Sequence, residues 1–248
     1  MMLYLIFGSS GGLGSNLVKF FKKDKKNVKG LDISASAYTD YLIDFNDTKK
    51  LISLVKEICL PYEMAICCIY CAIPNNRIRG GDILENYIIK ENNLITLQFN
   101  SLLAIACALE SIQDMNAEKN SKIFKSNLIS IGSVLSNKVS LVESPLYPAS
   151  KAASLSLIKY LSLKLSKKQI NCNTISPGLM ARNEKSKKFL EDRLSRFKKN
   201  IGITNYEEIY QTIIYISNSN LNSLRGKNIV LDDGLGDLEP FYIIDNVD

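Results

Sequence analysis

The stretch LYLIFGSSGGLGSNLVKFFKK, residues 3–23, decides the fold class of this chain. It opens with residues 3–7, an uninterrupted apolar run of strand length. Glycines stand at positions 8, 11, 12 and 14, and residues 13–23 have apolar side chains at helical spacing. Glycine permits a tight turn, and a helix N-terminus favours a bound pyrophosphate. The stretch therefore predicts a strand, a phosphate-binding turn and a helix.

An acidic residue ends the next predicted strand. Residues 28–31 form a short predicted strand, and Asp32 follows it directly, about twenty residues after the glycines. A carboxylate at this point accepts hydrogen bonds from the hydroxyl groups of an adenosine ribose and repels a 2′-phosphate. We therefore expect a dinucleotide site that prefers NAD(H) to NADP(H).

Short apolar runs alternate with helical segments along the rest of the chain. Further strands are predicted at residues 41–43, 64–72, 123–133, 170–176 and 228–232. Helices are predicted at residues 51–59, at 92–115 and from about 146 to 168, and two polar, Lys-rich helices from about 184 to 217. This alternation predicts an α/β fold with a doubly wound, mostly parallel sheet of the Rossmann type. We expect residues 1–248 to form one domain, with a basic, lid-like segment at about 182–200.

The composition excludes several kinds of chemistry. The chain has no His, which rules out Ser-His-Asp and Cys-His catalysis and any histidine metal site. The net charge of +6 fits either solvated helix faces or attraction to an anionic substrate, and we expect no nucleic-acid partner because basic and aromatic residues are not interleaved. Cys68 and Cys71 form a Cys-x-x-Cys pair inside an apolar run, so we expect buried thiols and no metal. The cysteine usage and the short N-terminal apolar run favour a cytoplasmic protein without a membrane span.

Tyr147 and Lys151 are the strongest catalytic candidates. Their spacing of four residues places both side chains on one face of a helix. A nearby ammonium group favours the phenolate and lowers the pKa of a tyrosine, which can then exchange a proton near neutral pH. A second pair with this spacing, Tyr160 and Lys164, is present, but only the first follows a serine, Ser133, that ends a predicted buried strand. The context therefore favours Tyr147 and Lys151.

These motifs together resemble the short-chain dehydrogenase/reductase family over nearly the whole chain, with the likeness strongest to its 3-oxoacyl reductase-like members. Asn100, Ser133, Tyr147 and Lys151 match the catalytic tetrad of the family. The resemblance implies cofactor contacts from Gly8, Ser10, Gly12, Leu13, Gly14, Asp32, Asp44, Phe45, Ala72, Lys151, Pro177 and Gly178. It also implies a role for each catalytic residue. Tyr147 exchanges the proton, Lys151 assists it and binds the nicotinamide ribose, Ser133 orients the substrate oxygen, and Asn100 holds a water linked to Lys151.

Two positions depart from the family pattern. The Asn-Asn-Ala-Gly motif is here Tyr70-Cys71-Ala72-Ile73, which alters the adenosine side of the site. A Thr five residues after Pro177 is replaced by Arg182, which is free to hold a cofactor phosphate, hold a substrate anion or face solvent.

The family resemblance implies an enzyme that interconverts a secondary alcohol and a ketone by hydride transfer with NAD(H). A sugar or a nucleotide-linked metabolite is one substrate class, and a 3-oxoacyl thioester is the alternative. A non-catalytic dinucleotide-binding sensor is an alternative of another class, supported by the two departures. The family also implies a homo-tetramer or homo-dimer built on the helices near 92–115 and 146–168. The apolar residues Leu94, Leu97, Leu102, Leu155, Ile158 and Leu161 fit either the core or such an interface.

Overall fold

The structure is a computed structural model that describes residues 2–62, 64–73, 93–119, 124–138, 144–181, 184–195, 202–220 and 222–235. The strands are β1 (Met2–Phe7), β2 (Asn27–Asp32), β3 (Tyr41–Leu42), β4 (Ala65–Tyr70), β5 (Ser126–Ile131), β6 (Ile170–Pro177) and β7 (Asn228–Leu231). The helices are α1 (Gly12–Lys23), α2 (Thr48–Cys59), α4 (Leu94–Glu118), α5 (Leu146–Lys164), α6 (Glu184–Leu194) and α7 (Tyr206–Asn218). Short 3₁₀ turns η1, η2 and η3 lie at Val134–Ser136, Ser166–Lys168 and Asn222–Leu224.

All seven strands join one parallel sheet in the order β3-β2-β1-β4-β5-β6-β7. The strand β1 is flanked by β2 and β4, so Phe7 is paired with Leu31 on one side and Tyr70 on the other. The chain order reverses between β1 and β4. In doubly wound sheets the ligand crevice lies outside the carboxyl ends of the strands at this reversal. The predicted sheet class is confirmed, and the topology fixes where a site is to be sought.

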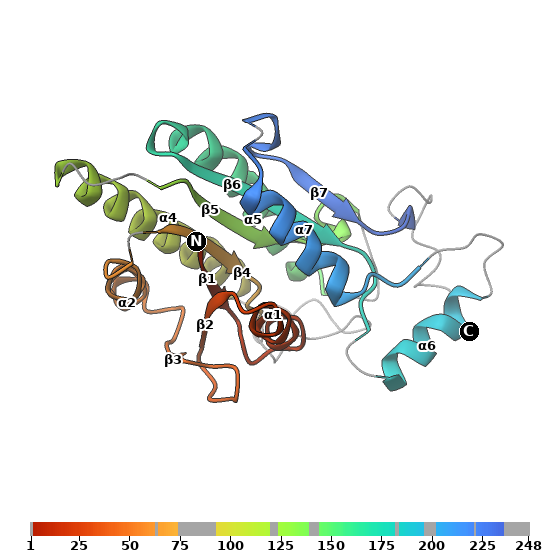
Figure 1. The fold of residues 1–248 in the computed structure, drawn as a ribbon. Helices are drawn as coiled ribbons and strands as arrows, with labels where there is room; N and C mark the ends of the chain where they lie inside the picture. Colours follow the sequence, from red (N-terminus) through yellow and green to blue (C-terminus); the bar gives the residue numbers. More distant parts are fainter. Residues whose placement is uncertain are drawn as a thin grey trace.

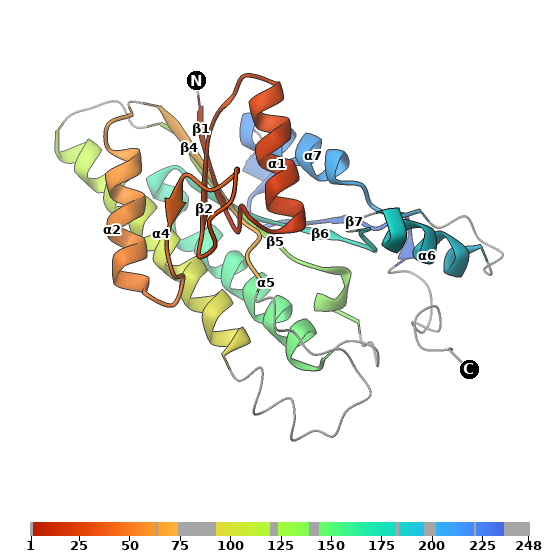
Figure 2. The ribbon, with the colours of Figure 1, turned by 90° about the horizontal axis from the view of Figure 1, so that it is seen from below.

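Helices cover both faces of the sheet (Figures 1 and 2). On one face, α2, α4 and α5 pack against the strands through a large apolar cluster that contains Leu51, Ile105 and Ile158. On the other face, α1 and α7 form a second cluster around Leu17 and Ile213. The two clusters bury β1, β2, β4, β5 and β6 on both sides, whereas the short edge strand β3 has Leu42 exposed.

The helix α4 is apolar on more than one side. By length and composition it is long enough to cross a membrane, but half of its most apolar window is buried inside the fold. It contacts both α2 and α5. Its composition is therefore that of a core helix that keeps one face exposed at the protein surface.

Two predicted elements differ from the structure. The prediction of two Lys-rich helices is wrong for α7, which contains no Lys and buries Ile209, Ile213 and Ile216 at helical spacing. The predicted helix from 146 ends at Lys164 rather than 168, because a 3₁₀ turn follows and Gln169 has a left-handed φ of 55°.

Candidate active site

The turn after β1 needs glycine at two points. Gly8 has a φ of +94°, and a Cβ atom there would lie 2.7 Å from the backbone nitrogen of Ala72. A Cβ atom on Gly14 would lie 2.0 Å from the carbonyl oxygen of Gly8. The turn therefore passes directly between the start of α1 and the segment after β4. Ala72 is buried and forms the floor beneath Gly8.

Helix α1 begins at this turn without a side-chain cap. Its N-cap residue is Gly11, so no side chain caps the first N–H groups of the helix. The first turn of α1 has no acidic residue and includes Gly12, Leu13 and Gly14. Uncapped N–H groups and the positive end of the helix dipole favour an anion. The residues present therefore fit a dinucleotide pyrophosphate.

Asp32 lies beside the same turn, at the end of β2. Its carboxylate accepts hydrogen bonds from the backbone N–H of Ser10 at 2.9 Å and of Ser34 at 3.0 Å. The side chain is 6% exposed. Asp32 is thus both the acidic group at the expected ribose position and a fixed acceptor that holds the glycine turn.

Tyr147 and Lys151 lie one turn apart at the start of α5. Lys151 is 1% exposed, and its Nζ donates a hydrogen bond to the carbonyl oxygen of Ile131, the last residue of β5, at 2.8 Å. The same Nζ lies 5.9 Å from the centroid of the Tyr147 ring. A buried ammonium group requires hydrogen-bonded partners, and this one is directed at the strand end and at the tyrosine. The structure therefore brings together the pair that the sequence singled out.

Ser133 follows β5 after Gly132 and caps the short turn η1. Its Oγ accepts a hydrogen bond from the backbone N–H of Leu135 at 3.2 Å. The ring of Tyr147 packs against the cluster of Leu135, Leu194 and Leu235, which η1 and α6 help to form. Ser133 and Tyr147 are therefore positioned by the same local packing.

Further backbone at the crevice comes from β6 and β4. Gly178, after Pro177, donates its N–H to the carbonyl oxygen of Leu231 at 2.8 Å, so the β6 end is tied to β7. Cys71 donates its thiol to the carbonyl oxygen of Phe7 at 3.1 Å. Burial raises the pKa of this thiol to about 12, although the ammonium of Lys151 opposes the shift. Cys71 therefore places an uncharged, buried thiol where the family motif has an asparagine side chain.

Asp44 and Phe45 follow β3. Asp44 is exposed, and its Oδ1 accepts two hydrogen bonds from Asn46. The ring of Phe45 is buried, with centroids 6.1 Å from Phe7 and from Tyr70. The side chain of Phe45 therefore packs in the core, and its carbonyl oxygen accepts a hydrogen bond from the hydroxyl of Ser101 at 3.3 Å.

The polar residues of α4 differ from the expectation in one respect. Asn100 is exposed, whereas Gln98, two positions earlier, is 1% exposed. The Oε1 of Gln98 accepts a hydrogen bond from Ser154 on α5 at 3.3 Å, and its Nε2 is buried without a partner in the described part of the chain. Sequence reasoning missed Gln98; the helical phase that buries Leu94, Leu102 and Ile105 would have pointed to it.

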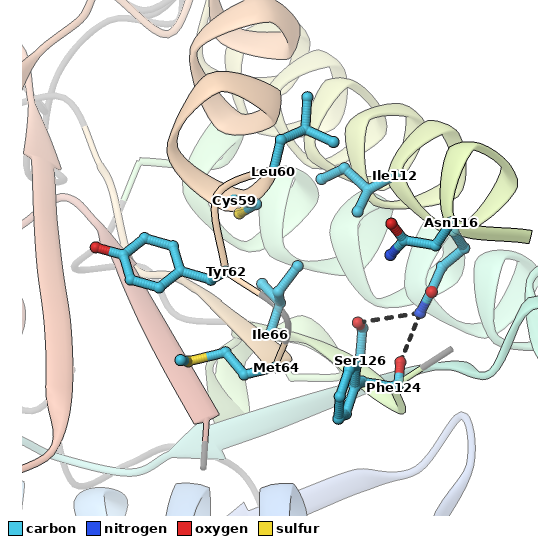
Figure 3. A pocket seen from close by; sticks show the side chains of 10 residues that line it. Cys59, Leu60, Tyr62, Met64, Ile66, Ile112, Asn116, Phe124 and Ser126 are labelled. Atoms are coloured by element: carbon cyan, nitrogen blue, oxygen red, sulfur yellow. Dashed lines mark hydrogen bonds between the residues drawn. The ribbon is translucent and has the colours of Figure 1, made fainter. Parts of the chain in front are cut away.

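Arg182 falls outside the described residues, so its role stays a prediction. Two other places in the described part of the chain lie away from this constellation. Tyr160 and Lys164, the second Tyr-Lys pair, are exposed on the outer side of α5. A pocket of about 10 Å³, room for about one water molecule, lies at the opposite sheet edge beside Met64 and Ser126 (Figure 3). It is too small for a metabolite.

The parallel sheet and the side chains that meet at its crevice define a Rossmann-type oxidoreductase. A family model described as enoyl-(acyl carrier protein) reductase matches residues 17–236. The chain belongs to the short-chain dehydrogenase/reductase family, as its motifs suggested.

Similar proteins extend over nearly the full length. The 3-oxoacyl-[acyl-carrier-protein] reductase FabG of Buchnera aphidicola subsp. Schizaphis graminum is 24% identical, covering 93% of this chain and 96% of its own. A short-chain dehydrogenase structure from Leptospira borgpetersenii with bound NAD+ has a TM-score of 0.75 at 19% identity, covering 95% of this chain and 92% of that one. ElxO with NADP bound also has a TM-score of 0.75, at 17% identity, covering 96% and 99%.

Proposed function

We propose that this protein is an NAD(H)-dependent oxidoreductase that interconverts a secondary alcohol and a ketone. The observation that carries the proposal is the placement of Lys151. Its buried ammonium is held by the end of β5 and faces the ring of Tyr147, beside the strand end that carries Ser133.

Tyr147, Lys151 and Ser133 each have a separate role in the proton transfer that accompanies hydride transfer. A nicotinamide dinucleotide, when bound, supplies or accepts the hydride. Tyr147 gives a proton to the carbonyl oxygen in reduction and takes it from the alcohol in oxidation. Lys151 stabilises the phenolate form through its charge. The Oγ of Ser133 accepts the N–H of Leu135, which leaves its own proton to be donated to the substrate oxygen. Asn100 remains our proposal for the residue that holds a relay water, although Gln98 is the more buried amide on α4.

The preference for NAD(H) rests on Asp32. Its buried carboxylate would face a 2′-phosphate, and like charges at such a site repel. Fluorescence titration should give tighter binding for NADH than for NADPH. Asp32→Asn removes the negative charge but keeps one oxygen that can accept a hydrogen bond from the glycine turn. The variant should therefore show a smaller difference in affinity between NADH and NADPH. Equal binding of both dinucleotides by the unaltered protein would contradict the assignment.

The substrate class has two candidates. A sugar or nucleotide-linked metabolite would suit a basic segment such as α6, which carries Lys185, Lys187 and Lys188. The similar 3-oxoacyl-[acyl-carrier-protein] reductase, which covers 93% of the chain, favours a 3-oxoacyl thioester instead. A panel of ketones, sugars and 3-oxoacyl thioesters, assayed by NADH absorbance, decides between them.

The catalytic assignment is tested by Tyr147→Phe. Loss of the hydroxyl should lower turnover by about 10²- to 10⁴-fold, the usual contribution of general acid–base catalysis, while NADH still binds. Tyr160→Phe is the matched control, because Tyr160 is exposed on the same helix and should not affect either quantity. Unchanged turnover in Tyr147→Phe would overturn the assignment. Tight NADH binding without turnover of any substrate would favour the sensor.

We also propose that a second copy of the chain covers the outer side of α4 and α5. Of the apolar residues that fitted either the core or an interface, Leu102 and Leu161 lie in the core. Three exposed apolar residues, Phe99, Leu103 and Tyr160, line a groove of about 430 Å³ between the two helices. Such an exposed apolar patch is typical of an interface.

A further inference from the structure

We propose that the hydroxyl of Tyr206, on α7, donates a hydrogen bond to the pyrophosphate of the dinucleotide. The inference rests on the proposed function, since it concerns the same cofactor. It adds a residue from the far end of the chain to a site that the glycine turn and Asp32 define.

The position of Tyr206 is fixed by the start of α7. Asn205 caps this helix, and its side chain accepts the backbone N–H of Glu208 at 2.8 Å. The Glu208 side chain in turn accepts the N–H of Asn205 at 3.2 Å. This reciprocal capping box holds the first residue of α7 in a defined place.

Helix α7 lies beside α1 (Figure 2). The ring of Tyr210 packs against Phe20 and Phe21, at centroid distances of 5.5 and 4.9 Å, and its hydroxyl donates to Asp24 at 2.5 Å. Tyr206 lies one turn earlier on α7, and its contact with Gly12 places its hydroxyl at the N-terminal end of α1. The hydroxyl of Tyr206 lies 3.3 Å from the point that a Cβ atom on Gly12 would occupy.

A hydroxyl at this place adds a directed donor to a group of backbone donors. Gly12 is the first residue of α1, and the helix has neither a side-chain cap nor an acidic residue in its first turn. A phosphate that accepts these N–H groups would lie close to the Tyr206 oxygen. Hydrogen bonds to a charged acceptor are stronger than those between neutral groups. Glycine at position 12 leaves the space that the hydroxyl occupies.

The test compares NADH and ADP binding to the unaltered protein and to Tyr206→Phe, by calorimetric titration. This variant keeps the aromatic ring, so any loss of binding affinity measures the contribution of the hydroxyl group. We expect both ligands to bind roughly tenfold more weakly, with an unchanged unfolding temperature in the absence of ligand. Tyr215→Phe, an exposed tyrosine further along α7, is the matched control and should bind as the unaltered protein does.

The outcomes are separable. Binding within twofold of the unaltered protein, or tighter binding, would overturn the role of Tyr206 and leave the proposed function standing. Weaker binding with a clearly lowered unfolding temperature would assign the hydroxyl to the fold and would also overturn it. Failure of the unaltered protein to bind NADH would instead overturn the proposed function itself.

Discussion

Gly8→Ala should damage both stability and cofactor binding, for reasons that the structure makes quantitative. The φ of +94° is a backbone conformation that residues with a side chain rarely adopt. The added Cβ would lie 2.7 Å from the nitrogen and 2.8 Å from the Cα of Ala72. Both are backbone atoms at the end of a central strand. Neither can move away as the tip of a flexible side chain would.

The expected loss combines two terms. A strained backbone residue costs about 1–3 kcal/mol and overpacking of a filled site about 1–3 kcal/mol, which gives a loss of about 2–6 kcal/mol in the free energy of unfolding. For a protein of this size the unfolding temperature falls by about 2–4 °C for each kcal/mol, so a decrease of about 4–24 °C is expected. NADH binding should weaken as well, because the turn is displaced.

Gly11→Ala is the matched control within the same turn. Its φ is −71°, which alanine adopts freely, and the nearest atom to the added Cβ is 3.4 Å away. As an uncapped N-cap position it should lose no more than about 1 kcal/mol. Thermal unfolding followed by circular dichroism measures both variants. An unfolding temperature of Gly8→Ala within 2 °C of the unaltered protein, or an equal loss in Gly11→Ala, would refute the reasoning.

Two further predictions concern the outer side of the helices. In a monomeric form of the protein, Cys107 should be the first of the six thiols to react with a thiol reagent, because it is exposed on the single chain while burial raises the pKa of the other five, to about 12 for Cys71. The proposed second copy, which covers the groove that Cys107 lines, should slow this reaction. A Cys107→Ser variant that reacts equally fast would contradict this. Leu103→Asp should shift the protein towards the monomer in light scattering, since it places a charge in the groove between α4 and α5. Tyr215→Asp, on the other layer of helices, should not, and an unaltered protein that is already monomeric at micromolar concentration would disprove the interface.

The sequence was sufficient for those features that depend on local pattern. The apolar run of β1, the glycines after it and Asp32 after β2 specify a strand, a turn and a neighbouring strand end in themselves. The Tyr147–Lys151 pair was distinguished from Tyr160–Lys164 by a strand and a serine upstream, and the structure places only the first pair at the crevice.

Features that depend on tertiary packing were not accessible in the same way. Leucines occur on several sides of α4, so periodicity alone could not separate the buried Leu102 from the exposed Leu103. The error over α7 had another cause. The Lys-rich stretch before it dominated the composition, although the spacing of Ile209 and Ile213 already indicated a core-facing helix. The approach of Tyr206 to Gly12 joins residues almost two hundred positions apart and has no local signal.

The packing around Tyr147 has a consequence for how the protein is made. The ring lies against Leu194 on α6 and Leu235 after β7, both buried, together with Leu135. Synthesis on the ribosome proceeds from the N-terminus at about 5–20 residues per second, and early segments fold while later ones are still absent. A nascent chain that has passed residue 151 thus carries Ser133, Tyr147 and Lys151 but lacks the surface that holds the tyrosine. The packing around Tyr147 becomes complete only when Leu194 and Leu235 have both been made and can pack against the ring.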